Sequence, residues 1–231
     1  MVDLNELKTE NALRWNRAKI TRNFTNVAKA LVDPDAKTRY KFVSDRTGVP
    51  WPVIAVIHER EASQNWKTQL GQGDPLNKVS VHIPAGRGPF HTWEDGAYDA
   101  LVNTSPHAAR WTDWSIGGTL TLLELYNGTG YAARELPSPY IWSGTDQYRA
   151  GKYVRDGVFD PRAVDAQLGC AGLLKTMMAL DKSINLWPAE PQAVPVQVVS
   201  PPLQPIAPPP KPDSIWSRIF AIFKSVNSGG K

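Results

Sequence analysis

Residues 51–61 constrain this chain more than any other stretch, and they read Trp-Pro-Val-Ile-Ala-Val-Ile-His-Glu-Arg-Glu. The prolines on either side of the first residue suit the first turn of a helix, where a missing backbone N–H costs little. Helical spacing then places Ile54, Ile57 and Glu61 on one face, with Glu59 on the opposite side. The pattern therefore predicts a buried helix that carries a carboxyl group from the core to the edge of a cleft.

Glu61 is the first candidate for a chemical role. Partial desolvation at the edge of the core disfavours the charged form and raises the pKa, as a general acid working near neutral pH requires. The alternative is a helix-end glutamate in water with an ordinary pKa. Both interpretations stay open on this segment alone, because one perturbed carboxylate is a probabilistic signal.

A polar, glycine-rich stretch follows the helix over residues 64–76, and connectors of this kind often carry function on a rigid scaffold. Val79, Val81 and Ile83 then alternate with polar residues, which predicts a short half-buried strand. Asp74 and Glu94 are candidates for a second carboxylate. Each also has a simpler interpretation, Asp74 as a turn former before a proline and Glu94 as an acid in a first helical turn.

Most of the remaining pattern is helical. Apolar spacing and capping signals predict helices near 20–31, 37–44, 92–101 and 112–126. A last core helix is expected to begin at Asp160-Pro161, with Val164 and Leu168 on its inner face. Gly117 inside the predicted helix over 112–126 lowers helix propensity but permits close packing. Residues 131–159 look irregular.

A second segment, Leu123-Glu124-Leu125-Tyr126-Asn127-Gly128-Thr129-Gly130-Tyr131, resembles the Tyr-Asn-Ala-Gly segment of goose-type lysozymes and lytic transglycosylases. The ordered set of short segments from His58 to Thr145 resembles a phage and prophage group of peptidoglycan hydrolases, and the likeness covers about residues 40–185. T4-type phage lysozymes share the spacing Glu-x8-Asp-x5-Thr. This spacing is absent here, because Leu70 occupies the place of the aspartate. The resemblance implies a mainly α, α+β lysozyme-like fold: a helical bundle around a central buried helix, with a small β element.

The resemblance also implies a function. It points to a muramidase or lytic transglycosylase that cleaves the bond between N-acetylmuramic acid and N-acetylglucosamine, with the glycan strands of peptidoglycan as its partner. Glu61 would act as the acid and then as the base, and water or the muramyl 6-hydroxyl would complete the reaction. Residues in the segments expected to form the cleft are candidates for sugar binding: Tyr126, Asn127, Tyr131, Trp142 and Tyr148.

Two other classes of protein remain open. A wall-binding or virion structural module could keep this fold without the chemistry, although an acid at the helix end argues against it. A zinc-dependent amidase would need several ligands, but His58-Glu59-Arg60-Glu61-Ala62 lacks the second histidine of the metalloprotease helix motif. We therefore expect neither a metal nor another cofactor, and the single cysteine, Cys170, is expected to be a small buried apolar residue.

Composition divides the chain into a catalytic domain over 1–187, a linker over 188–212 that holds half of the 20 prolines, and a cationic amphipathic helix over 213–231. That last helix could contact an anionic membrane or pack on protein. The net charge of +4 favours anionic polymers, and cell wall satisfies this without any nucleic-acid motif. No secretory signal or membrane-spanning run is visible, so we expect synthesis in the host bacterial cytoplasm and action on the cell wall.

Overall fold

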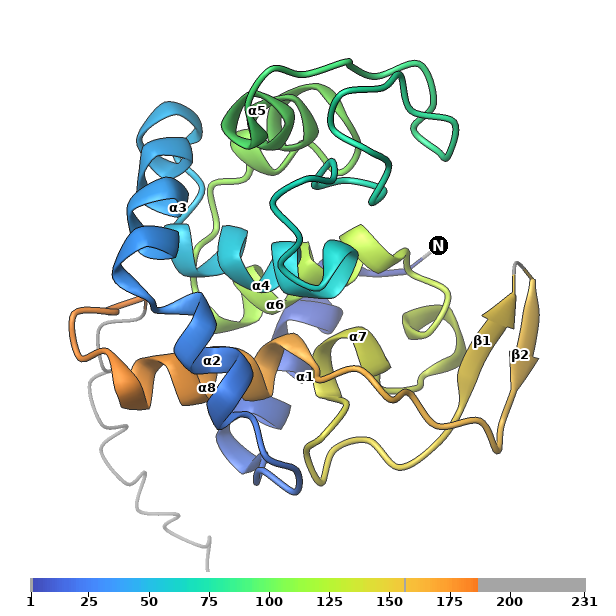
Figure 1. Ribbon diagram of the computed structural model, residues 1–231. Helices are drawn as coiled ribbons and strands as arrows, with labels where there is room; N and C mark the ends of the chain where they lie inside the picture. The colour runs from blue at the N-terminus through green and yellow to red at the C-terminus, as the bar shows by residue number, and fades with distance from the viewer. Residues whose placement is uncertain (1, 156, 187–231) are drawn as a thin grey trace, which may run out of the picture. The chain divides into compact units, whose positions relative to one another are not determined.

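The computed structural model describes residues 2–155 and 157–186. Within these ranges the chain forms eight α-helices, two short 3-10 helices and one two-stranded antiparallel sheet (Figure 1). The elements are α1 (Leu4–Arg17), α2 (Thr25–Leu31), α3 (Pro34–Thr47), α4 (Trp51–Ala62), α5 (Trp93–Asn103), η1 (Ala108–Arg110), α6 (Ile116–Asn127), η2 (Ala132–Arg134), α7 (Pro139–Trp142), β1 (Lys152–Arg155), β2 (Val158–Asp160) and α8 (Cys170–Leu180). The expectation of a mainly helical protein with a small β element is confirmed.

Helix α4 is the central helix of the fold, and it contacts α2, α3, α6 and α8 (Figure 1). It begins after Pro50 with Pro52 in its first turn, as the sequence predicted. All side chains from Pro52 to His58 are buried, so the helix is enclosed on every side and not along one stripe. Only the last turn approaches the surface, where Glu59 and Glu61 are half-buried.

Helix α1, which the sequence patterns did not predict, packs along α6. The two backbones come so close that a Cβ atom at Gly117 would lie 2.3 Å from the carbonyl oxygen of Lys8. The prediction that Gly117 permits close packing is therefore confirmed. The start of α6 differs by three residues from the expected one, because Ser115 and not Thr112 provides the N-cap hydroxyl.

The predicted strand at 79–83 is wrong. Val79, Val81 and Ile83 are exposed and belong to the long loop between α4 and α5, and among the described residues no strand pairs with them. The small sheet instead lies in the stretch expected to be irregular, where β1 and β2 pair with Tyr153 opposite Phe159. Alternation alone could not identify the strand, because a strand also needs a partner for its backbone groups.

The predicted start of the last core helix is also wrong, because α8 begins at Cys170. The residues before it are extended, with Val164 exposed and Asp165 turned inward. Arg22 donates hydrogen bonds to successive carbonyl oxygens of this segment, including that of Asp165 (3.2 Å). These long-range contacts override the local helix-start signal of Asp160-Pro161.

The predicted linker over 188–212 and the predicted amphipathic helix over 213–231 lie outside the described residues. In the part of the chain that is described, no helix is both long enough and apolar enough to cross a membrane.

Candidate active site

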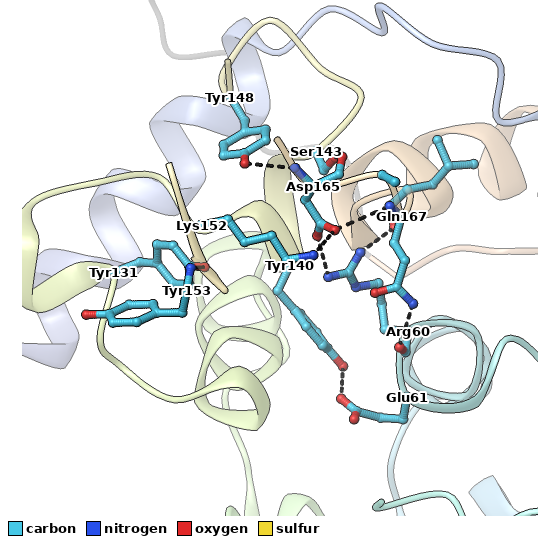
Figure 2. A network of polar contacts seen from close by, with 12 residues as sticks. Arg60, Glu61, Tyr131, Tyr140, Ser143, Tyr148, Lys152, Tyr153, Asp165 and Gln167 are labelled. Atoms are coloured by element: carbon cyan, nitrogen blue, oxygen red, sulfur yellow. Dashed lines mark hydrogen bonds and ion pairs between the residues drawn. The ribbon is translucent and has the colours of Figure 1, made fainter. Parts of the chain in front are cut away.

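Glu61 lies in the last turn of α4, and one of its carboxylate oxygens accepts a hydrogen bond from the hydroxyl of Tyr140 at 2.8 Å (Figure 2). Burial raises the pKa of Glu61 to about 7, although the Tyr140 hydrogen bond and the charge of Arg60 act in the opposite direction. A large fraction of Glu61 is therefore protonated at neutral pH, as a general acid requires.

Two tyrosines surround this carboxyl group. Tyr140 comes from α7 and is almost fully buried, and burial together with the charge of Glu61 raises the pKa of its phenol well above the ordinary value. Tyr126 comes from the end of α6 and is half-buried. Its hydroxyl is buried without a hydrogen-bond partner in the described part of the chain, and burial and then the charge of Glu61 raise its pKa. Both phenols therefore stay neutral and can serve only as hydrogen-bonding groups.

Arg60 adjoins Glu61 in the chain and belongs to a buried ionic network (Figure 2). Its guanidinium pairs with Asp165 at 3.0 Å and lies over the ring of Tyr140, 4.7 Å from the centroid. Lys152 of β1 pairs with the other oxygen of Asp165 at 2.8 Å. Burial alone would raise the pKa of Asp165, but the Lys152 hydrogen bond and the charge of Arg60 hold it below the ordinary value. The network fixes Arg60, and Arg60 supports the ring that contacts Glu61.

A pocket of about 430 Å³ lies beside the network. Its lining joins five parts of the chain: Arg60 from α4; Asn127, Gly130 and Tyr131 after α6; Pro139 from α7; Lys152, Tyr153 and Arg155 from β1 with Gly157; and Asp165 and Gln167 before α8. The helix-end segment and the Asn-Gly-x-Gly-Tyr segment, far apart in the sequence, therefore meet at one site.

Of the five predicted sugar-binding residues, Asn127 and Tyr131 line this pocket, and only Asn127 is exposed. The hydroxyl of Tyr131 accepts a hydrogen bond from the backbone N–H of Tyr153 at 3.0 Å, so Tyr131 anchors the hairpin to the segment after α6. Tyr126 is half-buried and does not line this pocket, but it lies close enough to Glu61 for the charge of that group to raise its pKa.

The prediction that Trp142 and Tyr148 stack on sugar rings is wrong. Trp142 is fully buried in the hydrophobic core. Tyr148 is also buried, and its hydroxyl donates to the carbonyl oxygen of Gly151 at 3.2 Å and accepts from the N–H of Asp165 at 3.1 Å. Trp142 is therefore a core side chain, and Tyr148 joins two loop segments through its hydroxyl.

The two candidates for a second carboxylate are engaged elsewhere. Asp74 is buried in the long loop, where it accepts hydrogen bonds from the N–H groups of Val81 (2.9 Å) and His82 (3.0 Å) and contacts the His82 ring. These contacts, the His82 N–H first, lower the pKa of Asp74. Both carboxylate oxygens of Glu94 accept hydrogen bonds from one edge of the Arg39 guanidinium, from Nε at 2.5 Å and from Nη2 at 3.2 Å. Burial would raise the pKa of Glu94, but the hydrogen bond and the charge of Arg39, together with a backbone hydrogen bond, hold it below the ordinary value. The simpler structural interpretation therefore holds for both.

The described residues include no group of three or more His, Cys, Asp or Glu side chains that could hold a metal ion. His58 is fully buried among aromatic rings, with its Nδ1 atom 3.0 Å from the hydroxyl of Tyr40. Burial lowers the pKa of His58 to about 4, so it stays neutral. Cys170 is buried as well, and burial raises the pKa of its thiol.

The sequence patterns missed the members of the ionic network and the tyrosine that contacts Glu61. One signal was available for Arg60, because a charged residue in an otherwise apolar helix must find a partner when it is buried. Nothing local marks Tyr140 or Asp165, whose positions depend on where α7 and the segment before α8 pack. Comparison with protein-family models, with curated proteins and with solved structures finds no match for this chain.

Proposed function

We propose that this chain is a peptidoglycan glycosidase of the lysozyme type, with Glu61 as its general acid and base. The observation that carries the proposal is the half-buried carboxyl group at the end of the buried helix α4, with a pKa of about 7. Arg60, the chain neighbour of Glu61, lines a pocket together with Asn127 and Tyr131. This supports a glycan as the substrate, because Asn127 and Tyr131 lie in the segment that resembles a sugar cleft.

In the proposed reaction, protonated Glu61 donates its proton to the glycosidic oxygen while the bond from that oxygen to C1 of the muramyl residue breaks. The resulting carboxylate then removes a proton from the incoming nucleophile as its oxygen bonds to C1, which restores the acid. Water as the nucleophile gives hydrolysis, and the muramyl 6-hydroxyl gives a 1,6-anhydro product. Tyr140 would stabilise the carboxylate between the two steps through its hydrogen bond.

This route needs no carboxylate nucleophile. A retaining double displacement would need a second carboxyl group about 5–5.5 Å from the acid. Asp74 and Glu94 are both held by other partners, and Asp165 is buried between Arg60 and Lys152. The engagement of all three carboxylates favours a mechanism in which Glu61 acts alone.

Mass spectrometry of the products from purified peptidoglycan tests the proposal. We expect muropeptides cleaved between N-acetylmuramic acid and N-acetylglucosamine, and their masses distinguish reducing ends from 1,6-anhydro ends. Release of free peptides would indicate an amidase. Binding to walls without any product would indicate a non-catalytic wall-binding or virion structural module. Either of these two results contradicts the proposal.

A glycosidase of this kind would work on the cell wall, and a phage or prophage origin would place its synthesis in the host cytoplasm. Glycan strands are its proposed partner, and residues 213–231 are a proposed second contact, with anionic membrane. These assignments rest on the sequence resemblance and on the charge of the tail.

A further inference from the structure

A second pocket, of about 720 Å³, is lined mainly by α1, the end of α6 and the segment from Thr129 to Ser138. It shares no lining residue with the pocket beside Arg60, so the two pockets are separate. None of its lining residues has a role in the proposed reaction. Its size is in the range of pockets that bind small molecules.

Acidic side chains outnumber basic ones in the lining of this second pocket. Its charged residues are Asp3, Glu6, Glu10, Arg14, Glu124 and Glu135. Asp3 already accepts hydrogen bonds as the N-cap of α1, and Asp3 and Glu6 lie close to the first residue of the chain, which is outside the described range. Without these two acids, one cation less three ionised carboxylates still leaves a net charge of −2. The pocket therefore favours a cation.

Two buried oxygen atoms in the lining have no hydrogen-bond partner in the described part of the chain. One is Oε1 of Glu124, a residue that is 2% exposed, and the other is the hydroxyl of Ser138, which is 1% exposed. Buried polar atoms are normally paired, so two unpaired oxygens beside one pocket indicate a missing hydrogen-bond donor. Water could donate to both, but it would leave the charge of the buried carboxylate uncompensated. A cation with several N–H groups would supply both the donors and the opposite charge.

The rest of the lining indicates which kind of cation fits. Because the described residues contain no cluster of side chains suited to a metal ion, the ligand would be held by hydrogen bonds and not by coordination. An ammonium group has three donors and can pair with a carboxylate and a hydroxyl at once. Leu7, Leu136 and Trp142 line the same pocket and offer an apolar surface to a chain of methylene groups. Charge and apolar lining together fit an aliphatic amine.

We propose that this pocket binds an aliphatic diamine, with one ammonium group at the buried oxygens of Glu124 and Ser138. The second ammonium group would face Glu10 and Glu135, which line the same pocket and are exposed. Because the pocket is built from α1, α6 and the segment before α7, its ligand would also stabilise the folded state. The inference does not depend on the proposed function, since it involves neither Glu61 nor peptidoglycan.

A comparison of three small molecules tests the chemistry of the pocket. Isothermal titration calorimetry with the full-length protein at pH 8, where the carboxyl group of Glu124 is mostly ionised, would measure binding of 1,4-diaminobutane, 1-aminobutane and 1,4-butanediol. We expect the diamine to bind about threefold to tenfold more tightly than the monoamine, the range for a charge contact that remains partly solvated. The uncharged diol should not bind measurably. A diamine that binds no more tightly than either of the other compounds, or that shows no saturable binding, would overturn the inference.

Variants then locate the site. Glu124→Gln should weaken binding of 1,4-diaminobutane about 10-fold to 100-fold, because it removes the charge from a buried hydrogen-bonded contact. Ser138→Ala, which removes the hydroxyl and changes no charge, should weaken it about threefold to tenfold. Asp45→Asn is the matched control, because Asp45 is an exposed acid of α3 outside this pocket, and it should bind like the wild type.

Thermal unfolding gives a second measurement with the same proteins. Addition of 1,4-diaminobutane should raise the Tm of the wild type and of Asp45→Asn, and it should leave the Tm of Glu124→Gln nearly unchanged. Unchanged affinity in Glu124→Gln, or equal losses of affinity in all three variants, would mean that the amine binds elsewhere and would overturn the inference.

Discussion

At the scale of single residues, the contact between Glu61 and Tyr140 has the most direct chemical consequences. Burial pushes the pKa of this carboxyl group up, and the hydrogen bond from Tyr140 pulls it down. The value of about 7 is the balance of the two effects. Changing either residue should therefore change both the rate and its dependence on pH.

Glu61→Gln should abolish cleavage of peptidoglycan, because glutamine keeps the shape of the side chain but has no transferable proton. General acid–base groups contribute about 10²–10⁴-fold to the rate, so the loss should be of that order. Turbidity loss of isolated walls measures it, and circular dichroism checks that the fold survives. Glu59→Gln, two residues away in the same helix, is the matched control and should be nearly silent. Equal losses in both variants would refute the assignment.

Tyr140→Phe should move the alkaline limb of the pH profile to higher pH. The Tyr140 hydrogen bond lowers the pKa of Glu61, so its removal raises that pKa and keeps the acid protonated over a wider range. A pH series of kcat/KM measures the shift. Tyr148→Phe, which removes a buried hydroxyl that contacts Gly151 and Asp165 instead, should leave the limb in place. A limb that stays fixed or moves to lower pH in Tyr140→Phe would contradict the contact.

At the scale of elements, the interface between α1 and α6 contains a buried acid. Glu124 of α6 is 2% exposed, and burial raises its pKa from 4.5 to about 7, although a hydrogen bond with Asn11 acts against this. The folded state thus holds a proton that the unfolded chain releases between these two values. Stability should therefore fall as the pH rises from about 4.5 to 7, and the loss should persist above that range.

Glu124→Gln should make the protein more resistant to denaturant at pH 8 than the wild type, with a smaller difference at pH 5. A shift of this size in a buried group corresponds to a change on the order of 3 kcal/mol in the free energy of unfolding. Urea denaturation at the two pH values measures it. Glu6→Gln on the exposed side of α1 is the control and should behave like the wild type. The same pH dependence in Glu124→Gln and in the wild type would show that this carboxyl is not the cause.

Gly117→Ala should separate α1 from α6. The new Cβ atom would lie 2.3 Å from a backbone oxygen of α1, which cannot rotate away as a side chain could. Overpacking of this kind costs about 1–3 kcal/mol of unfolding free energy. Gly71→Ala is the matched control, because its Cβ would meet only the Cβ of Ala100 at an ordinary 3.6 Å. Equal denaturation midpoints for the two variants would contradict the close packing.

At the scale of the whole molecule, we expect the tail to be separable from the part that carries the proposed activity. Removal of residues 188–231 should leave hydrolysis of purified peptidoglycan intact but reduce binding to anionic vesicles and killing of intact cells. Residues 213–231 contain Arg218, Lys224 and Lys231 against Asp213, and three cations less one anion give +2. Added salt should weaken vesicle binding because it screens this charge. Loss of activity on naked peptidoglycan after truncation, or a full-length protein that ignores vesicles at low salt, would contradict the prediction.

Elements that depend on near neighbours could be predicted from the sequence alone. The start of α4 follows from its prolines, and Thr92 caps α5 by accepting a hydrogen bond from the N–H of Asp95, as the sequence indicated. The position of Glu61 at the end of a buried helix could also be predicted, because it depends only on the spacing of residues within that helix. These features are encoded within a few turns of chain.

Only the tertiary structure could decide what surrounds Glu61. Tyr140 lies 79 residues from Glu61 in the chain, and Asp165 lies 105 residues from Arg60. The same holds for the elements that were predicted wrongly. Residues 79–83 alternate like a strand but have no partner strand among the described residues, and residues 160–169 carry a helix-start signal that the contacts of Arg22 override. A local pattern records the preferences of neighbouring residues. Burial, and with it the pKa of a carboxyl group, depends on which distant segments pack against it.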